Sequence, residues 1–546
     1  MTIMRFILLA LLLAQCSSAQ LLFLLSVQNA ANPSIQGAVV PDSLATITAT
    51  LPFSTTPVPL PKTLDVTIHG KAALVVGAEG ASVTVLVPAS IPLGEAVLSI
   101  VENGGAGVTI VDVVASDFGL FTNSSGIGQA VAQNVVAGVA STNNLTHPAH
   151  PGDTVTLSGT GLGSVAPSKV AVLLGGHPAP VSFAGHSAAI AGADTIDFQV
   201  PSDPAIPNGC FVAVEVVVNG ARSNTASISK AAEGAAACTP PIDLTVAQMT
   251  MLDAGQSIPY VSFLIDGLVS VPPGSSGLVR DESFNVQAIA ANEATLAVIS
   301  QPLLADDVFY SCTPSSGATI AAIFFSAFLD LGPELTLTGP GTTGFILTSP
   351  YLAFYSLSLP TGPPVSSPAH LPPPYFVPGV WQIASPGAPP NPYPQPQYSA
   401  LPFSAQITTP PTIELTNYSS LQAIDPQKGV VVAWNPLGYG PSDVVTVNVA
   451  GVSCNAHATD GQLSIPPGAF PTTTAGVAKG SPISAMAPPV YFQISASPRP
   501  DQIARTDIPQ AGGGFMPGIF KYSFTESFPI HPPQPVAPPP PPPVAQ

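Results

Sequence analysis

Residues 212–228, VAVEVVVNGARSNTASI, decide the fold class of this chain. Valines stand at alternate positions from Val212 to Val218, which is the spacing of a strand with one buried face. Asn219-Gly220 then separates this run from a second strand-like run. Asn-Gly is the strongest short hairpin signal, because a type I′ turn needs positive φ at both central residues. The stretch therefore predicts two antiparallel strands joined by a two-residue turn.

The composition extends this prediction to the whole chain. Of 546 residues, 66 are Pro and 47 are Gly, and only 8% are charged, against roughly 25% in ordinary soluble domains. A disordered chain combines low hydrophobicity with high charge, whereas this chain is 46% hydrophobic. Frequent Pro and scarce Glu, Lys and Arg argue against a helical bundle, a coiled coil or a Rossmann-type domain. We predict an all-β chain of tandem immunoglobulin-like β-sandwich domains.

An internal repeat supports this organisation. Five short matches occur in the same order at offsets of 106 to 116 positions, which defines a unit of domain size. The matched pairs are 41–48 with 151–158, 66–70 with 172–176, 85–88 with 198–201, 91–94 with 206–209, and 101–104 with 217–220. Asn103-Gly104 in the first copy stands where Asn219-Gly220 stands in the second.

We expect the following division of the chain. The parts are a signal peptide at 1–19, a first sandwich at 21–117, a linker at 118–147, a second sandwich at 148–238, a β-rich domain at 239–407, an immunoglobulin-like sandwich at 408–530 and a disordered proline-rich tail at 531–546. The tail contains six consecutive prolines, which favour an extended polyproline II conformation. The strongest candidate for a short helix is Asp243 to Ala254, ended by Gly255.

The N-terminus predicts export. An apolar run from Phe6 to Ala14 follows Arg5, and small residues precede a cleavage position after Ala19. One alternative is an uncleaved anchor that continues through residues 21–25, and another is lipidation at Cys16. No later segment is long and apolar enough to predict a membrane span.

The charge of the chain limits its partners. The formal net charge is −18, and an acidic field repels phosphate groups, so we expect no nucleic-acid binding. No polybasic stretch favours an anionic membrane surface. We expect a protein or polysaccharide partner at the cell surface.

Four cysteines remain after the predicted cleavage: Cys210, Cys238, Cys312 and Cys454. An even number in an exported chain favours disulfides, and four cysteines allow three pairings. Proximity favours Cys210–Cys238, because the hairpin at 219–220 brings its two strands together, and Cys312–Cys454 is then the second bridge. No C-x-x-C spacing points to zinc.

The second repeat resembles a known family. Residues 151–163, PGDTVTLSGTGLG, together with 197–201, DFQVP, and 208–212, NGCFV, are similar to the uncharacterised C-terminal β-sandwich domain of secreted acidobacterial proteins. That domain is close in style to immunoglobulin-like IPT/TIG domains. The resemblance is more divergent over 30–147 and weak over 239–530. It implies a fold and export, and it transfers no functional site.

Two motifs invite a catalytic interpretation. Gly159-Thr160-Gly161-Leu162-Gly163 could cradle a phosphate, but such a loop needs a following helix N-terminus, and Pro167 follows instead. Gly185-His186-Ser187 is similar to part of a nucleophile elbow, which needs a strand–turn–helix context that the sequence does not provide. We interpret both motifs as loops between strands.

Other side chains suggest ligands only in part. His147 and His150 lie in an extended Pro-flanked segment, and Asp194 with Asp197, or Asp306-Asp307, offers carboxylates without a calcium-loop spacing. We therefore expect no metal and no cofactor. Three aromatic residues among prolines could form a stacking platform for a sugar, or else cover the edge of a sandwich; they are Tyr375, Phe376 and Trp381. We expect Trp434, within an apolar strand, to belong to a core.

Three functional hypotheses follow. The first is a secreted or cell-surface, non-catalytic multidomain protein with a structural, adhesion or interaction role. The second is an extracellular carbohydrate-binding protein that uses the aromatic residues near 375–381. The third is a hydrolase with its site in 239–407, although no catalytic residue can be nominated from the sequence.

Overall fold

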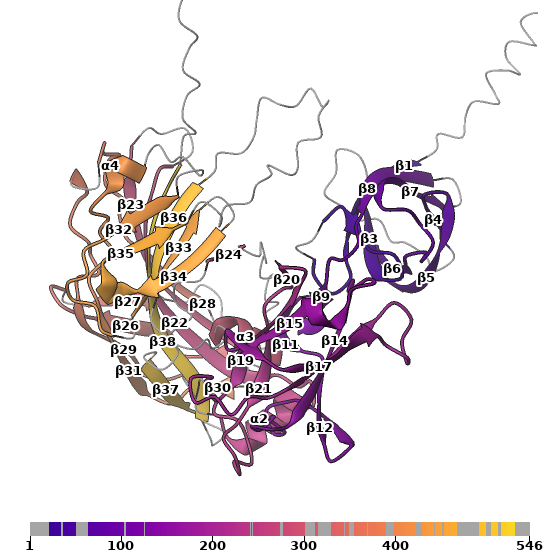
Figure 1. Ribbon diagram of the computed structural model, residues 1–546. Helices are drawn as coiled ribbons and strands as arrows, with labels where there is room; N and C mark the ends of the chain where they lie inside the picture. Colours follow the sequence, from indigo (N-terminus) through magenta and orange to yellow (C-terminus); the bar gives the residue numbers. More distant parts are fainter. Residues whose placement is uncertain are drawn as a thin grey trace, which may run out of the picture.

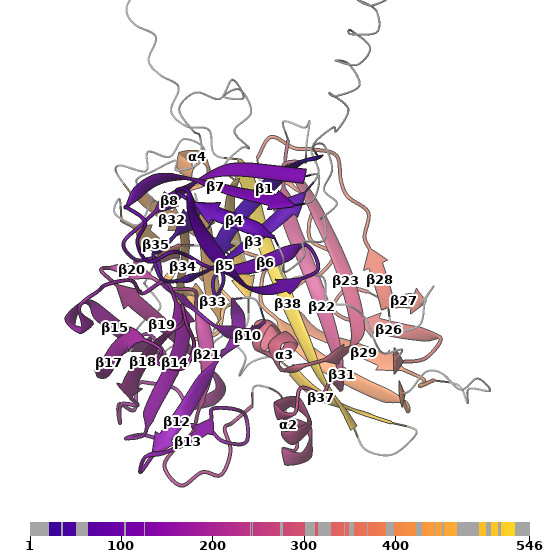
Figure 2. The same cartoon turned by 90° about the vertical axis from the view of Figure 1, so that its right-hand side faces the viewer.

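The computed structural model places the described chain in three packed parts. The described residues are 21–529 except 34–35, 51–63, 103–104, 125, 241, 243, 273–276, 301–311, 315–328, 343, 349–353, 368–369, 389–397, 422–428, 442, 450–451, 467–490, 498–503 and 511–514. The predicted signal peptide, Cys16, Asp306-Asp307 and the proline tail lie outside them. Figures 1 and 2 show the first domain in indigo, the second in purple, and the C-terminal part from pink to yellow.

The first domain is a β-sandwich whose two sheets share strand β1 (Leu21–Asn29). In one sheet β1 pairs antiparallel with β3, and in the other it pairs parallel with β8. The strands are β1, β2 (Ala38–Val39), β3 (Leu44–Thr50), β4 (Asp65–Ile68), β5 (Lys71–Glu79), β6 (Ser82–Leu86), β7 (Gly94–Glu102) and β8 (Gly105–Val113). Alternate residues such as Ile47, Val83 and Leu98 fill the space between the sheets and are fully buried.

The second domain has the same plan with more strands. These are β9 (Gly119–Leu120), β10 (Thr122–Ser124), β11 (Ile127–Ala130), β12 (Ala132–Val136), β13 (Val139–Thr142), β14 (Thr154–Thr160), β15 (Val170–Leu174), β16 (His177–Ala179), β17 (Val181–His186), β18 (Asp194–Gln199), β19 (Gly209–Val218), β20 (Ala221–Arg222) and β21 (Ala226–Lys230), with a short 3₁₀ helix at Pro167–Lys169. One sheet runs β13-β12-β14-β18-β17, and the other runs β10-β11-β21-β19-β15-β16. Phe198, Val172 and Val214 are among the buried residues between them.

The expected linker at 118–147 is wrong, because this segment supplies strands to the second domain. Strand β11 pairs parallel with β21, and β12 pairs antiparallel with β14. These two pairings repeat what β1 makes with β8 and β3 in the first domain. Residues 127–136 are therefore the counterpart of β1, and a sandwich without them would leave an unpaired sheet edge.

The repeat in the sequence corresponds to equivalent strands. The first matched segments form β3 and β14, which pair with β6 and β18 respectively. Of the later matches, one lies at the start and the other at the end of β7 in the first domain and of β19 in the second. These two strands pair with β4 and β15 respectively. The predicted hairpin after β19 is confirmed: Val218 lies opposite Ala221, and Asn219 and Gly220 have φ of 50° and 87°.

The C-terminal part is built on one nine-stranded sheet. The strands in order are β24 (Cys312–Pro314), β34 (Val452–His457), β33 (Val444–Val449), β36 (Tyr491–Ser497), β38 (Phe515–Pro529), β22 (Ile258–Ser270), β23 (Val279–Ala291) and β28 (Phe354–Ser358), with β37 (Ala504–Pro509) paired to β38. The expected boundary at 407/408 does not separate two sheets, because β22 pairs parallel with β38 over ten residues. Residues far apart in the sequence thus share one layer.

Two smaller layers cover this sheet. A four-stranded sheet consists of β26 (Glu334–Thr338), β27 (Phe345–Thr348), β29 (Gly379–Ser385) and β31 (Phe403–Thr409), and it encloses a core that includes Phe263, Phe520 and Trp381. The pair β32 (Val430–Ala433) and β35 (Gln462–Ile465) encloses a second core around Trp434, as expected for that residue. Strands β25 (Leu329–Asp330) and β30 (Tyr398–Ser399) form a separate parallel pair.

The helices of the described chain are short. They are α2 (Val246–Asp253), α3 (Glu293–Ser300) and α4 (Tyr418–Leu421), with a 3₁₀ turn at Ala458–Asp460. Helix α2 lies within the predicted segment, and Thr245 and Gln248 form a capping box at its start. Gly255, with φ of 73°, follows its end as predicted.

Candidate functional site

The outer surface of the first domain carries an exposed apolar face. Val97 and Val101 on β7, with Val108 and Ile110 on β8, are 53–66% exposed. Strand alternation explains their position, because Ala96, Leu98 and Ile100 at the alternate positions of β7 point into the core. Val97 lies directly opposite Ile110 in the β7–β8 register. We call these four residues the apolar face. The sequence contains a signal for this face that the prediction above does not use, since apolar residues occupy both the inward and the outward positions of the two strands.

One end of the apolar face is acidic. Glu95 and Asp112 lie opposite each other in the same register, and both are exposed. They form the next pair on the same face of the sheet after Val97 and Ile110. Like charges placed directly opposite on a sheet are destabilising. The ammonium group of Lys71 on β5 is already bonded elsewhere, because it donates to the backbone and hydroxyl oxygens of Ser90. A cationic group on a partner would relieve the repulsion between Glu95 and Asp112.

Polar contacts fix the first domain on the second. The Asn29 amide donates to the carbonyl oxygens of Asp117, at 2.8 Å, and Thr160, at 3.3 Å. The Thr160 hydroxyl accepts from the backbone of Leu44 and donates to the carbonyl oxygen of Gly192. Asn29 and Thr160 are both buried, so these bonds lie in the interface and not at its rim.

The glycine-rich segment 159–163 belongs to this interface. A Cβ atom on Gly161 would collide with the carbonyl oxygen of Asp117, and one on Gly163 would collide with that of Ala115. Gly161 also has a φ of 92°. The glycines therefore allow the chain that enters the second domain to pass close to β14. The structural interpretation of this motif is supported. The helix that follows it is a 3₁₀ turn of three residues, Pro167–Lys169, which is too short for the phosphate interpretation.

The segment 185–187 ends β17 and begins the turn that leads to β18. The Ser187 hydroxyl accepts from the backbone N–H groups of Ala189 and Ile190, which fixes a turn. His186 Nδ1 lies 2.7 Å from Asp194 Oδ1, and the other carboxyl oxygen of Asp194 accepts from the Leu162 backbone. Burial raises the pKa of Asp194, and the bonds from Leu162 and His186 oppose that rise. The residues thus close the second domain against the glycine-rich segment.

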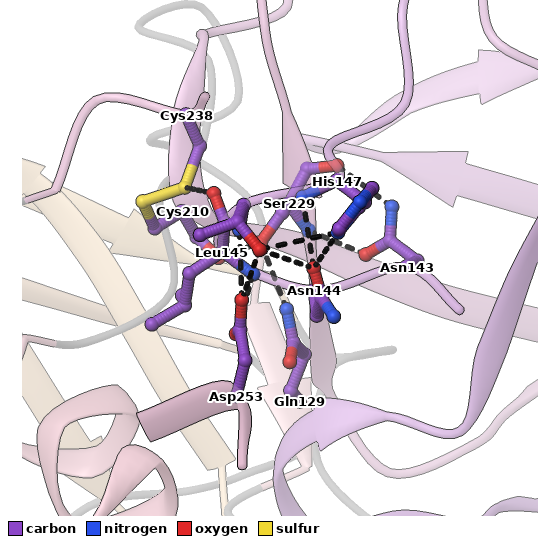
Figure 3. The surroundings of a disulfide bond; sticks show 10 residues. Gln129, Asn143, Asn144, Leu145, His147, Cys210, Ser229, Cys238 and Asp253 are labelled. Carbon is purple, nitrogen blue, oxygen red and sulfur yellow. Dashed lines mark hydrogen bonds between the residues drawn. A yellow bond between two sulfur atoms is a disulfide. The ribbon is translucent and has the colours of Figure 1, made fainter. Parts of the chain in front are cut away.

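The junction of the second domain and the C-terminal part holds the predicted disulfide between Cys210 and Cys238 (Figure 3). The bridge lies in a buried apolar cluster with residues of α2, α3, β22 and β38. Beside it, Asp253 of α2 accepts from the backbone N–H groups of Leu145 and Thr146 at 2.9 and 3.0 Å. The same carboxyl group accepts from the Thr146 hydroxyl at 2.6 Å.

A second carboxyl group lies in the same junction. Glu293 of α3 accepts from the Asn123 amide of β10 at 3.1 Å. Burial raises the pKa of Glu293 to about 7, and the charge of Asp253 adds to the rise. Apolar packing and polar bonds therefore connect these two parts, and the disulfide lies within the shared apolar cluster.

The proposed aromatic platform is wrong as a sugar-stacking surface. Phe376 and Trp381 are fully buried, and their rings meet edge to face at 5.1 Å. The Trp381 indole donates to the Val377 carbonyl oxygen, which satisfies its only polar group. Only Tyr375 is exposed. Trp381 belongs to β29, where it alternates with other core residues.

The structure does not bring the other candidate ligands together. Asp197 accepts from the Thr156 hydroxyl at 2.6 Å, while Asp194 binds His186, so the two carboxyl groups serve different contacts. His150 lies beside Asp153, and His147 beside Asn144. Within the residues that the structure describes, no three His, Cys, Asp or Glu side chains gather as a metal site would require. Among the described helices, none has the length and hydrophobicity needed to cross a membrane.

The remaining two cysteines occupy facing positions. The β24–β34 register places Cys312 opposite Cys454, and Cys454 is buried and disulfide-bonded. Facing residues in an antiparallel pair have Cα atoms about 4.5–5.5 Å apart, a separation that a disulfide spans. The register therefore supports Cys312 as the partner of Cys454.

No protein-family model and no curated protein matches the chain. Solved structures of tandem domains do. The Bacteroides ovatus mixed-linkage glucan utilization locus protein SGBP-B, in complex with mixed-linkage heptasaccharide, is 12% identical, covers 76% of this chain and 78% of its own, and has a TM-score of 0.14. Immunoglobulin domains 1–4 of Sidekick-1 are 11% identical, with 92% and 99% coverage and a TM-score of 0.10. The N-terminal eight immunoglobulin domains of DSCAM are 8% identical, with 93% and 54% coverage and a TM-score of 0.13.

These scores are too low to carry an argument about function. The sheet pairings described above establish the class directly: this is an all-β protein of tandem immunoglobulin-like β-sandwich domains.

Proposed function

We propose that the chain is an exported, non-catalytic protein that acts at the cell surface by binding, in a structural, adhesion or interaction role. The observation that carries this proposal is the apolar face. Four large apolar side chains side by side are unusual on a solvated sheet surface, and such patches mark interaction sites. A disulfide at Cys210–Cys238 supports an oxidising compartment and hence export.

The partner is a protein whose contact surface is apolar at its centre and carries Lys or Arg at one edge. Apolar area supplies the affinity, and a cation opposite Glu95 and Asp112 supplies complementarity. A second copy of the same face fits less well. If the two faces met in antiparallel orientation, this acidic end would lie against the end near Asp65, which is also acidic and exposed.

Carbohydrate binding through Tyr375, Phe376 and Trp381 loses its basis, because two of these rings are buried. The hydrolase hypothesis for 239–407 stays an alternative that assays on the purified chain test directly.

The experiment compares cells that display the full chain with cells that display the variant Val97→Asp/Ile110→Asp, at equal surface amounts measured by antibody. We expect the wild-type chain to increase cell–cell or cell–matrix attachment and the variant to lose that increase. Equal attachment by both would refute the role of the apolar face. Removal of the displayed chain from intact cells by added protease tests its surface location separately.

A further inference from the structure

A groove of about 590 Å³ opens in the C-terminal part, far along the chain from the apolar face. One wall is formed by β31 and the neighbouring β29, and the other by the turn that precedes β33. Its lining comprises Val380, Gln406, Ile407, Thr408, Thr409, Pro410, Gly438, Gly440, Asp443 and Tyr522. A volume of this size lies in the range of small-ligand sites.

The floor of the groove carries a fixed carboxyl group. Asp443 is only 6% exposed. The Tyr522 hydroxyl donates to its Oδ1 at 3.0 Å, and the Gly440 backbone donates to its Oδ2 at 2.6 Å. Burial raises the pKa of Tyr522, and the charge of Asp443 raises it further, so the phenol stays a hydrogen-bond donor. Each carboxyl oxygen keeps capacity to accept a further bond from a ligand.

The wall of the groove offers neutral polar side chains. Gln406 and Thr408 are exposed because the alternating Ala405 and Ile407 point into the core. Side chains two positions apart on a strand are separated by about 6.8 Å along its axis. Val380 of β29 lies opposite Thr408 in the register and adds an apolar surface beside these groups.

This lining selects a ligand by its chemistry. It contains an amide, hydroxyls and a carboxyl group, but no Lys, Arg or His. Anionic ligands are disfavoured by Asp443 and by the net charge of −18. A single carboxyl group whose oxygens already accept two bonds is a poor site for a metal cation. Strand β31 ends the described four-stranded sheet, so a peptide strand is the rival ligand. Such a peptide would pair with the backbone of β31 and would leave the side chains of Gln406 and Thr408, on the face of the sheet, unused.

We propose that the groove binds a neutral saccharide. Sugar hydroxyls would donate to Asp443 and exchange hydrogen bonds with Gln406 and Thr408, and a sugar C–H face would lie against Val380. This site is separate from the apolar face, and neither Phe376 nor Trp381 lines it. Since no exposed aromatic ring lines the groove, the affinity is expected to be modest.

Isothermal titration of the full-length mature chain with neutral gluco-, xylo-, manno- and galacto-oligosaccharides tests the proposal. We expect one of these to bind with a Kd below about 1 mM. Gln406→Ala and Thr408→Val should each weaken that binding by about fivefold or more, because each removes a hydrogen bond. Thr348→Val is the matched control, since Thr348 is exposed on β27 of the same sheet, outside the groove.

Four results would overturn the proposal. The first is no binding by any oligosaccharide at concentrations up to about 10 mM, and the second is equal affinity of the groove variants and the wild type. The third is the same loss of affinity in Thr348→Val, and the fourth is preferential binding of an acidic sugar or an amine. Titration of the Val97→Asp/Ile110→Asp variant separates the two sites. It should keep its saccharide affinity whether or not the proposed protein interaction exists.

Discussion

The side-chain amide of Asn29 donates to the carbonyl oxygen of Thr160 across 131 positions of the chain. The same side chain donates to Asp117 and accepts from the backbone of Ala31 and Asn32. One buried residue therefore organises the end of β1 and joins it to the second domain. The direction in which the first domain presents its apolar face depends on this contact.

Replacement Asn29→Ala should loosen that junction. It leaves two buried carbonyl oxygens and two backbone N–H groups without their partner, at a cost of about 1–3 kcal/mol in unfolding free energy. Small-angle scattering should show a larger radius of gyration or a broader distance distribution, and thermal unfolding should begin at a lower temperature. An unchanged scattering profile together with an unchanged unfolding curve would show that Asn29 does not hold the two domains.

The Cys210–Cys238 bridge closes a loop of 28 positions in a buried cluster. The double variant Cys210→Ala/Cys238→Ala should have a free energy of unfolding lower by roughly 3–4 kcal/mol, because the unfolded chain regains the entropy of that loop. Urea unfolding of oxidised wild type and variant measures the difference. Coincident midpoints would contradict a structural role for the bridge.

The facing register of Cys312 and Cys454 predicts the second bridge. Non-reducing proteolysis of the purified, oxidised chain should release one cross-linked peptide pair that contains these two residues. Free thiols at both positions, or a Cys210–Cys312 peptide, would show that the pairing is wrong.

Glu526 makes stability depend on pH. Its side chain is 4% exposed, one carboxyl oxygen has no hydrogen-bond partner, and burial raises its pKa to about 8. The folded chain therefore holds a proton that the unfolded chain releases above about pH 4.5. Stability falls as the pH rises from about 4.5 to 8, with a cost of roughly 3 kcal/mol at pH 7.

Glu526→Gln removes this titration. Thermal unfolding measured from pH 5 to pH 8 should show a smaller decline in Tm for the variant than for the wild type. A residual decline is expected from Glu293, whose pKa burial also raises, to about 7. If the wild type and the variant decline equally, Glu526 does not hold a proton in the folded chain.

The elements that the sequence predicted depend on neighbouring residues. The turn at Asn219-Gly220 and helix α2 follow from local chemistry, and both are present. The Cys210–Cys238 bridge followed from a hairpin and a short separation. In each case the relevant physical interaction lies within about 30 positions.

The features that the sequence did not predict depend on contacts between residues far apart in the chain. Alternation in residues 127–136 does not indicate that they complete the second sandwich, and nothing local in β22 indicates β38 as its neighbour. Prolines around residues 375–381 favoured a surface location, yet the alternation of Trp381 with Ile383 places both in the core. The groove also escaped, because β31 and Asp443 meet only in the folded chain.

The most direct test of the central claim is a binding isotherm of the purified, labelled chain on intact cells or their envelopes. The apolar-face variant Val97→Asp/Ile110→Asp is compared with Val136→Asp/Val139→Asp. The control residues are also exposed valines facing each other in a hairpin, but they lie in the second domain. We predict saturable binding by wild type and control, and at least about tenfold weaker binding by the apolar-face variant, because burial of each lost side chain contributes about 1.5–3 kcal/mol. Superimposable isotherms for all three proteins would contradict it.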